Sequence, residues 1–419
     1  MNLDLHSISE KKPGKKWKKL FEEHWPSYKA WFVSKKNANS PSLRKARARL
    51  KKYMPEFYPT YLQLCELAGP DGEAHLFLTG YKPPAYISGC AQIVSKEEAQ
   101  LVRNYDFDPD LSEGTLLHSS WNGRSVIAMG DCLCGVVDGI NANGLVVSLT
   151  FGGRKVVGEG FGIPFILRYI LEFCSTLEEA ESALNRIPSH MSYNIMLMNP
   201  YGEHRLIQVA PDNTPLITDL SASTNHQGIV DWPEHAAFTK TIERELYLHE
   251  VLADANHTAD QIVDKFLSAP LFNRKYRFGF GTIYTAVYRA KEGALELRWP
   301  GITLRQTFAE FNEGITTIEY SETVPGSTSD AIEESQLLTD YTGAVEAYWL
   351  EYGRGWANKE LTNIPNILGN STTEPMEAVS DRIKELLTQM DSVSVVENTN
   401  SWQKLAQAWS KVSVIDPDA

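Results

Sequence analysis

The sequence predicts a layered α+β domain. Three observations indicate this class: short β-rich runs begin near residue 85, similar runs return near residue 192, and a helical block occupies residues 163–187 between them. Strands joined by short turns pair antiparallel, and the apolar faces of such sheets must be covered by another layer. Sheet packed on sheet, with helices outside, is one arrangement that satisfies this requirement.

The N-terminal part of the chain is expected to be mostly helical over its first 70 residues. Apolar and charged residues recur at helical spacing in residues 15–36 and again in residues 40–69. Ser40 and Ser42 are candidate N-caps, and Gly69 is a candidate C-cap.

The β-rich part of the chain begins near Ala85, where runs of β-branched residues are separated by Gly and Asn. Three turns, at residues 141–144, 199–202 and 291–293, are expected to close hairpins. The expected strands lie within residues 91–94, 100–107, 125–141, 144–153, 192–211 and 281–300.

The longest apolar run, residues 161–174, leads into the central helical block. It is too short to cross a bilayer and contains Arg168 and Glu172, so we expect a buried helix and no membrane partner. A second helix should open at the capping-box spacing Ser175-x-x-Glu178.

Charge and cysteine content restrict the partners and the compartment. A net charge of −13 disfavours nucleic acid, which needs a positive surface. Residues 1–54 nevertheless carry 15 basic and 4 acidic side chains, a balance of +11 that leaves −24 for the remainder. These basic residues form either a solvated helical arm or a segment that docks on the acidic body. Five cysteines without an apolar secretory signal predict reduced thiols and a cytoplasmic protein.

Cys90 is the candidate nucleophile. A cysteine needs a nearby base to act at neutral pH, and its own α-amino group can serve if the residue becomes the first of its chain. That requires cleavage of the Gly89-Cys90 bond, and glycine tolerates the close approach of the thiol to its carbonyl. We therefore expect residues 1–89 to form a pro-segment and residues 90–419 the catalytic domain.

Charged residues follow Cys90 at hairpin distance. With a four-residue loop at residues 95–98, Val94 would face Ala99 and Cys90 would face Arg103, whose guanidinium should lower the pKa of the thiol. Strand alternation sends Asp106 to the opposite face. If both charged residues serve one site, the strand should be irregular near residues 104–105.

Several segments together resemble the acyl-coenzyme A:6-aminopenicillanic-acid acyltransferase-like family, which is related to the choloylglycine hydrolases among the N-terminal-nucleophile (Ntn) hydrolases. The resemblance spans residues 53–311. It is carried by the Gly89-Cys90 junction, Arg103-Asn104-x-Asp106, DGINANGLVVSLTF (138–151), SYNIMLMNPYGE (192–203), STNHQ (223–227) and GTIYTAVYRAKEGALELR (281–298).

This resemblance implies a four-layer αββα sandwich, self-cleavage before Cys90, and hydrolysis or acyl transfer on linear amides or thioesters without a cofactor. It implies that Arg103 and Asp106 orient the nucleophile and that Asn225 helps to bind the oxyanion. Arg244 corresponds to a further site arginine. Secondary oxyanion or substrate-pocket candidates are Asn104, Thr150, Phe151 and His226. Threonine at position 150 departs from the asparagine common in relatives, so its oxyanion contribution is in question.

Other interpretations compete with this one. The fold could belong to an uncleaved binding or scaffold protein, or Cys90 could pair with His226 in a cysteine peptidase. Cys132-x-Cys134 lacks the further ligands of a zinc site, so no metal is expected. Residues 151–162 are glycine-rich but lack a P-loop ending, which favours a mobile loop beside the site. The pro-segment should stay with the large chain, a small-molecule amide or thioester is the expected partner, and a homo-oligomer is compatible with the sequence.

Overall fold

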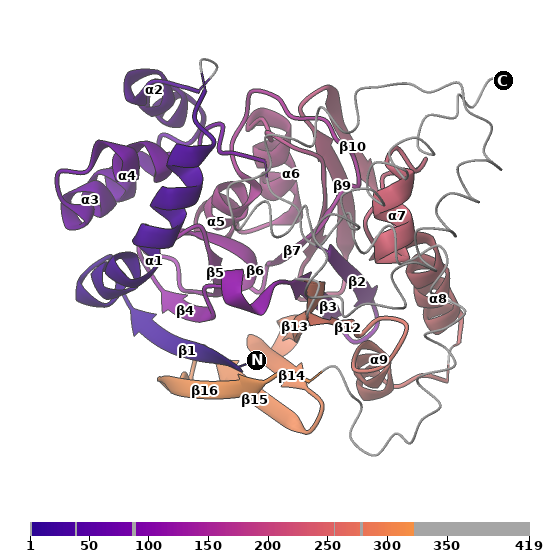
Figure 1. Ribbon diagram of the computed structural model, residues 1–419. Coiled ribbons are helices and arrows are strands. Elements are labelled where there is room, and N and C mark those ends of the chain that lie inside the picture. The colour runs from indigo at the N-terminus through magenta and orange to yellow at the C-terminus, as the bar shows by residue number, and fades with distance from the viewer. Residues whose placement is uncertain (1, 38–39, 86–88, 255, 277–279, 322–419) are drawn as a thin grey trace, which may run out of the picture. The chain divides into compact units, whose positions relative to one another are not determined.

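A computed structural model of the protein describes residues 2–37, 40–85, 89–254, 256–276 and 280–321 (Figure 1). The end of the predicted catalytic domain, residues 322–419, lies outside these described residues. The chain divides into two compact units. The larger comprises Met1–Asp231, Thr241–Asn273 and Phe280–Tyr320 and contains the candidate site. In the smaller unit the described elements are helix α7 (Pro233–Thr239) and strand β12 (Arg274–Lys275).

The first sheet of the larger unit has nine strands in the order β10-β9-β8-β7-β6-β5-β4-β1-β16. Neighbours are antiparallel except β1 and β4, which run parallel. The strands are β1 (Asn2–Glu10), β4 (Thr115–Ser119), β5 (Val126–Asp131), β6 (Gly135–Asn141), β7 (Val146–Phe151), β8 (Tyr193–Met198), β9 (His204–Ala210), β10 (Asn213–Thr218) and β16 (Gly314–Glu319). The predicted turns at residues 141–144 and 199–202 join β6 to β7 and β8 to β9, as expected.

The second sheet follows the order β11-β2-β3-β13-β14-β15, and every neighbouring pair is antiparallel. Its strands are β2 (Gly89–Ser95), β3 (Gln100–Phe107), β11 (Ala222–Ser223), β13 (Phe280–Arg289), β14 (Ala294–Trp299) and β15 (Ile302–Thr307). The third predicted turn, at residues 291–293, joins β13 to β14.

The two sheets face each other through β2 and β7, and helices cover their outer faces (Figure 1). Helices α5 (Ile163–Phe173) and α6 (Leu177–Arg186) pack on the first sheet, and α8 (Thr241–Ala253) and α9 (Ala259–Phe266) pack on the second. The predicted αββα sandwich is therefore confirmed. The N-cap of α6 is Thr176, one residue after the predicted Ser175.

Alternation along β2 and β3 divides their side chains between two layers. Ala91, Ile93 and Val102 join an apolar cluster with α8 and α9. The alternate residues, including Cys90 and Arg103, point between the sheets. The candidate nucleophile thus lies on the inner face of the sandwich.

The N-terminal segment of residues 1–89, called the leader below, consists in its described residues of a strand followed by helices. Helices α1 (Lys15–Ser34), α2 (Leu43–Tyr53), α3 (Tyr58–Ala68) and α4 (Gly72–Phe77) agree with the expected helical character. Ser42 accepts a bond from Lys45 N at the start of α2, and Gly69 ends α3 at φ +79°. None of the described helices has the length and apolar character needed to cross a membrane.

The helical prediction is wrong for the first residues of the leader, because β1 lies within the first sheet between β4 and β16. Leu5 and Ser7 are buried on one face of this strand. Alternating burial of this kind satisfies both the backbone and the apolar side chains of an extended segment. The leader therefore completes a sheet of the body.

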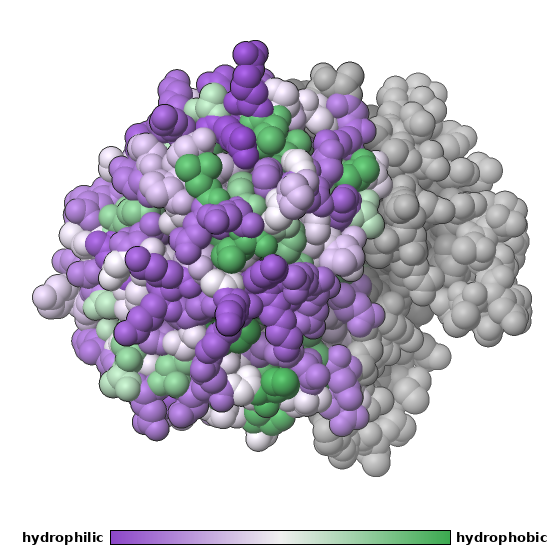
Figure 2. All heavy atoms as spheres, turned by 90° about the vertical axis from the view of Figure 1, so that its left-hand side faces the viewer, coloured by the Kyte–Doolittle hydropathy of each residue, from purple (hydrophilic) through white to green (hydrophobic). Residues whose placement is uncertain are grey.

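The leader also docks through its helices, which resolves the two alternatives for its basic charge. Trp17 Nε1 donates to Leu133 O at 2.9 Å, and Lys16 pairs with Glu313 at 2.5 Å. The outer surface of α1 to α4 is largely hydrophilic with smaller apolar areas (Figure 2). Val33 of α1 and Leu62 of α3 are large apolar side chains that are exposed. The leader thus packs its apolar side inward.

Candidate active site

Cys90 is the second residue of β2 and is fully buried. It pairs with Tyr105, and Arg103 pairs with Gln92, so the predicted register was wrong by two residues. The loop covers residues 96–99, one position later than expected, and Ala99 adopts φ +47°. A shift of two residues keeps every side chain on its face. Arg103 is therefore diagonal to Cys90, and its Nη2 donates to Cys90 Sγ at 3.1 Å.

Arg103 is a fully buried cation that bridges the two sheets. Its Nε donates to Leu149 O at 2.9 Å, and its Nη1 forms an ion pair with Asp138 of β6. The same Nη1 lies 3.3 Å from Tyr284 Oη. These contacts fix the plane of the guanidinium, so Nη1 faces the Asp138 carboxylate and Nη2 faces the Cys90 sulfur.

The surroundings of Cys90 disfavour the thiolate form of its side chain. Burial raises the pKa of the thiol, and the positive charges of Arg103 and Arg244 oppose this effect only in part. Arg103 lowers the pKa of the thiol, as expected, but by less than burial raises it. Loss of hydration outweighs the contact with the guanidinium.

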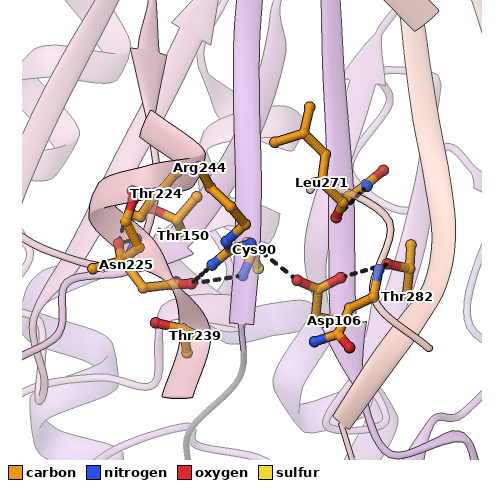
Figure 3. Close-up of polar contacts among 12 residues, drawn as sticks. Cys90, Asp106, Thr150, Thr224, Asn225, Thr239, Arg244, Leu271 and Thr282 are labelled. Carbon is orange, nitrogen blue, oxygen red and sulfur yellow. Dashed lines mark hydrogen bonds and ion pairs between the residues drawn. The ribbon is translucent and has the colours of Figure 1, made fainter. Parts of the chain in front are cut away.

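A second polar chain reaches the backbone of Cys90 (Figure 3). The Cys90 N–H donates to Asn225 Oδ1 at 3.1 Å, and Arg244 Nη2 donates to the same oxygen at 2.7 Å. Arg244 Nη1 pairs with Asp106 Oδ2 at 3.1 Å. Four of the predicted site residues thus meet at the start of β2.

Asp106 acts from the helix-facing side of the second sheet, as strand alternation predicted. It accepts from Thr282 Oγ1 at 2.7 Å as well as from Arg244. Burial raises the pKa of its carboxyl group, and Arg244 and Thr282 oppose the shift. The irregularity expected near residues 104–105 lies instead in the partner strand β13, between Thr282 and Tyr284. Asp106 is therefore linked to Cys90 through Arg244 and Asn225.

Asn225 lies in a loop after β11, and hydrogen bonds from neighbouring segments fix this loop in place. Its backbone N–H donates to Thr241 Oγ1 at 2.6 Å, and its Nδ2 donates to Phe151 O at 3.2 Å. Thr150 Oγ1 donates to Thr224 O at 2.5 Å. The predicted pocket residues 150 and 151 thus support the Asn225 loop.

Asn194 belongs to this support, although sequence reasoning missed it. Its Nδ2 lies 3.0 Å from each of three acceptors, which are Thr150 Oγ1, Thr224 O and His226 O. Two of these acceptors flank Asn225 in the sequence. The only available signal was the position of Asn194 within the SYNIMLMNPYGE segment, which carries no chemistry by itself.

His226 is engaged away from the sulfur. Its Nε2 lies 2.8 Å from Glu245 Oε2, and its Nδ1 lies 3.1 Å from Thr241 Oγ1. A peptidase dyad would require one ring nitrogen within reach of the thiol. Both nitrogens are committed to α8, so this arrangement gives the dyad no support.

Asn104 points toward α9 rather than between the sheets. Its Nδ2 donates to Phe266 O at 2.8 Å and to Leu271 O at 3.0 Å, and its Oδ1 accepts from Thr285 Oγ1 at 2.7 Å. These bonds tie the second sheet to the helix layer. The expected pocket role of Asn104 is therefore replaced by a structural one.

Gly89 has no room for a side chain. A Cβ at this position would lie 2.1 Å from the Cζ atom of Phe280. Carbon atoms at rest approach only to about 3.5–4.0 Å. Glycine therefore allows the start of β2 to pass directly against the Phe280 ring.

Cys132 and Cys134 lie at the turn between β5 and β6 rather than along a strand, because Cys132 and Leu133 adopt φ +55° and +68°. The strand expected within residues 125–141 is therefore interrupted by a turn at this pair. Within the described part of the chain, no group of three or more His, Cys, Asp or Glu side chains is arranged to hold a metal ion.

The family model for acyl-coenzyme A:6-aminopenicillanic acid acyl-transferase matches residues 94–302. This range includes Arg103, Asp106, Asn225 and Arg244 and begins after Cys90. A search of curated proteins gave no match.

Three solved structures share a weak likeness with the chain. A mutant of conjugated bile acid hydrolase from Clostridium perfringens is 12% identical, with TM-score 0.39, over 58% of this chain and 100% of that one. Penicillin V acylase from Agrobacterium tumefaciens is 11% identical, with TM-score 0.36, over 53% and 86%. An N-acylethanolamine-hydrolyzing acid amidase ortholog from Caenorhabditis elegans is 16% identical, with TM-score 0.37, over 55% and 100%. Because these scores lie below 0.5, the family assignment rests on the family match.

Proposed function

Because this chain belongs to the acyl-coenzyme A:6-aminopenicillanic acid acyl-transferase family, we propose that it is a self-processing enzyme whose nucleophile is Cys90. Membership makes it an amidohydrolase or acyltransferase. The finer assignment is supported by one observation above all. The sulfur of Cys90 contacts Arg103 Nη2 at 3.1 Å, while the backbone nitrogen of the same residue contacts Asn225 Oδ1 at 3.1 Å.

Processing begins when Cys90 Sγ attacks the carbonyl carbon of Gly89. A carbon–sulfur bond forms, the Gly89–Cys90 peptide bond breaks, and the thiol proton passes to the released nitrogen. Water then hydrolyses the thioester, which leaves a carboxylate on Gly89 and a free α-amino group on Cys90. Cleavage detaches only Gly89 from β2, since the proposed boundary falls between the first two residues of this strand.

The freed amine then serves as the base. With a reference pKa of about 7.7–8.0, an α-amino group takes and returns a proton near neutral pH. Asn225 Oδ1, which holds this nitrogen before cleavage, is in place to hold it afterwards. The Arg244 cation behind Asn225 disfavours the ammonium form, which keeps the amine available as a proton acceptor.

The donors and charges around the sulfur divide the remaining roles. Arg103 faces the developing thiolate, and Asp106 steadies Arg244. Asn225 Nδ2 is bonded to Phe151 O, so we assign Asn225 to the amine rather than to the oxyanion. An acyl-enzyme on Cys90 completes the first half of the reaction, and water or an amine accepts the acyl group in the second.

The substrate we propose is a linear amide or an acyl thioester. Hydrolysis and acyl transfer share the attack of Cys90 and differ in the final acceptor. N-acyl amino acids, penicillins, acyl-peptides and acyl-coenzyme A thioesters should be incubated with the processed protein. Formation of the free acid or of a new amide then identifies the acceptor.

We propose that the leader, residues 1–89, remains bound after cleavage. Its strand β1 is hydrogen-bonded to β4 on one side and to β16 on the other. Loss of the leader would expose an edge of β4 and leave β16 without its neighbour, an unfavourable outcome for a sheet. A cytosolic location is supported by the five cysteines, all of which are free thiols.

Intact mass of the purified protein tests this proposal. We expect two fragments of 89 and 330 residues from the chain of 419 residues. Cys90→Ala should give one uncut, folded chain without activity. An uncut wild-type chain would support the scaffold alternative, and loss of turnover in His226→Ala would support the peptidase alternative.

A further inference from the structure

We propose that Asp138 is a positioning residue for the nucleophile, which holds the Arg103 guanidinium against the Cys90 sulfur and shares its charge. The proposal rests on the assignment of Cys90 as nucleophile. Asp138 lies on β6, in the opposite sheet from Cys90 and Arg103. Its carboxylate forms an ion pair with Arg103 Nη1, while Nη2 of the same guanidinium contacts the sulfur.

The pair is shielded from water, since the side chains of Asp138 and Arg103 are both 0% exposed. A buried cation without a counter-ion is strongly unfavourable, so Arg103 must share its charge with whatever anions lie within reach. Among the described residues, the Asp138 carboxylate is the anion that pairs with Arg103, and the Cys90 sulfur becomes a second one when the thiol ionises. They therefore compete for one positive charge, and Asp138 limits how much of it the sulfur receives.

Two tyrosines of β13 donate hydrogen bonds to the Asp138 carboxylate, the group that competes with the Cys90 sulfur for the charge of Arg103. Tyr284 Oη donates to Asp138 Oδ2 at 2.8 Å, and Tyr288 Oη donates to Asp138 Oδ1. Hydrogen bonds to a carboxylate stabilise and spread its negative charge. A buried carboxylate needs such donors to satisfy its remaining acceptor sites. The two bonds fix the position of the Asp138 carboxylate and, through the ion pair, the orientation of the Arg103 guanidinium.

Because of this competition, the Cys90 sulfur stays neutral until it attacks a carbonyl carbon. With Asp138 in place, Arg103 belongs to a neutral pair and stabilises the thiolate only in part. Without the carboxylate, the sulfur becomes the best counter-ion for Arg103. The titratable or charged groups around the sulfur are Arg103, Tyr105 and Asp106 of β3, Asp138 of β6, Tyr284 and Tyr288 of β13, and Arg244 of α8.

The test is the titration of the Cys90 thiol in Asp138→Asn, measured as ultraviolet thiolate absorbance minus that of the matching Cys90→Ala protein. Asparagine keeps the shape and removes the charge. The midpoint should fall by about one pH unit or more, because a like charge near the sulfur has been removed. Tyr288→Phe should shift the midpoint the opposite way by a smaller amount, since the carboxylate loses a donor.

Glu172→Gln is the matched control. Glu172 is a buried carboxylate paired with the buried Arg168, so its loss imposes a similar stability cost. It should leave the Cys90 midpoint unchanged. A midpoint that is unchanged or raised in Asp138→Asn overturns the proposal and leaves Asp138 a purely structural partner. If Asp138→Asn fails to fold, a midpoint in Tyr288→Phe that stays constant or falls overturns it instead.

The experiments distinguish failure of the Asp138 proposal from failure of the proposed self-processing function. The contacts among Asp138, Arg103 and Cys90 exist in the uncut chain, so the titration does not depend on turnover. Intact mass gives the processing state of each protein, and midpoints are compared between proteins in the same state. A wild-type chain that never cuts would contradict self-processing while leaving the predicted shift in Asp138→Asn measurable.

Discussion

Gly89→Ala should slow self-cleavage by about a hundredfold. The new methyl carbon would lie 2.1 Å from Phe280 Cζ, whereas carbon contacts settle near 3.6 Å. The start of β2 or the ring must therefore move by about 1.5 Å. Overpacking of this kind costs about 1–3 kcal/mol, and a misplacement of about 1 Å at a reacting centre can reduce the rate about 10²-fold.

The assay is the fraction of uncut chain over time, followed by intact mass after purification of freshly made protein. Gly72→Ala is the matched control, because a Cβ there meets nothing within 4 Å. Adding Phe280→Ala to Gly89→Ala should recover part of the rate, with Phe280→Ala alone as reference. If Gly89→Ala cuts at the wild-type rate while Phe280 is intact, close passage of β2 against the ring has no part in cleavage.

Three further predictions concern charge, pH and assembly. Arg244→Gln should lower turnover at least about tenfold and destabilise the fold by about 3 kcal/mol, since it leaves Asp106 buried and unpaired; unchanged kinetics would remove Arg244 from the site. Burial and the neighbouring Glu113 raise the pKa of Asp131 to about 7, above its unfolded value of about 3.9. The folded state therefore binds this proton more tightly, and the stability it contributes, complete below about pH 4, is lost as pH rises through 7. Asp131→Asn should flatten this part of the stability curve from chemical denaturation, and an unaltered curve would contradict the assignment. Residues 1–89 should co-elute with the large fragment in gel filtration until denaturant is added; separation in native buffer would show that β1 does not hold the halves together.

Hydrophobic periodicity was sufficient to predict the main strands and helices, whereas the four-layer sandwich was implied by the family resemblance. The runs at residues 91–94 and 100–107 became β2 and β3, and the block at residues 163–187 became α5 and α6. The strand β1 was missed because an isolated extended segment has no hairpin partner nearby in the sequence. Its neighbours, β4 and β16, lie far along the chain, and no local pattern encodes such pairing.

The sequence predicted which residues gather around Cys90 more completely than it predicted the contacts between them. Alternation placed Arg103 on the face of Cys90 even though the register was wrong by two residues, because faces repeat with a period of two. Alternation also placed Asp106 on the opposite face, but the ion pair with Arg244 that links it to Cys90 was not predicted. Asp138 was part of a quoted segment without a role, since only the packing of one sheet on the other brings it to Arg103.

A free N-terminal cysteine carries an amine and a thiol on adjacent carbons, and cyanobenzothiazole condenses with that pair to form a ring. Labelling of the purified wild-type protein with this reagent tests whether Cys90 has acquired its own amine. We predict label on the 330-residue fragment of the wild type, and none on Cys90→Ala. A wild-type chain that remains 419 residues long and takes up no label would contradict the account at its centre.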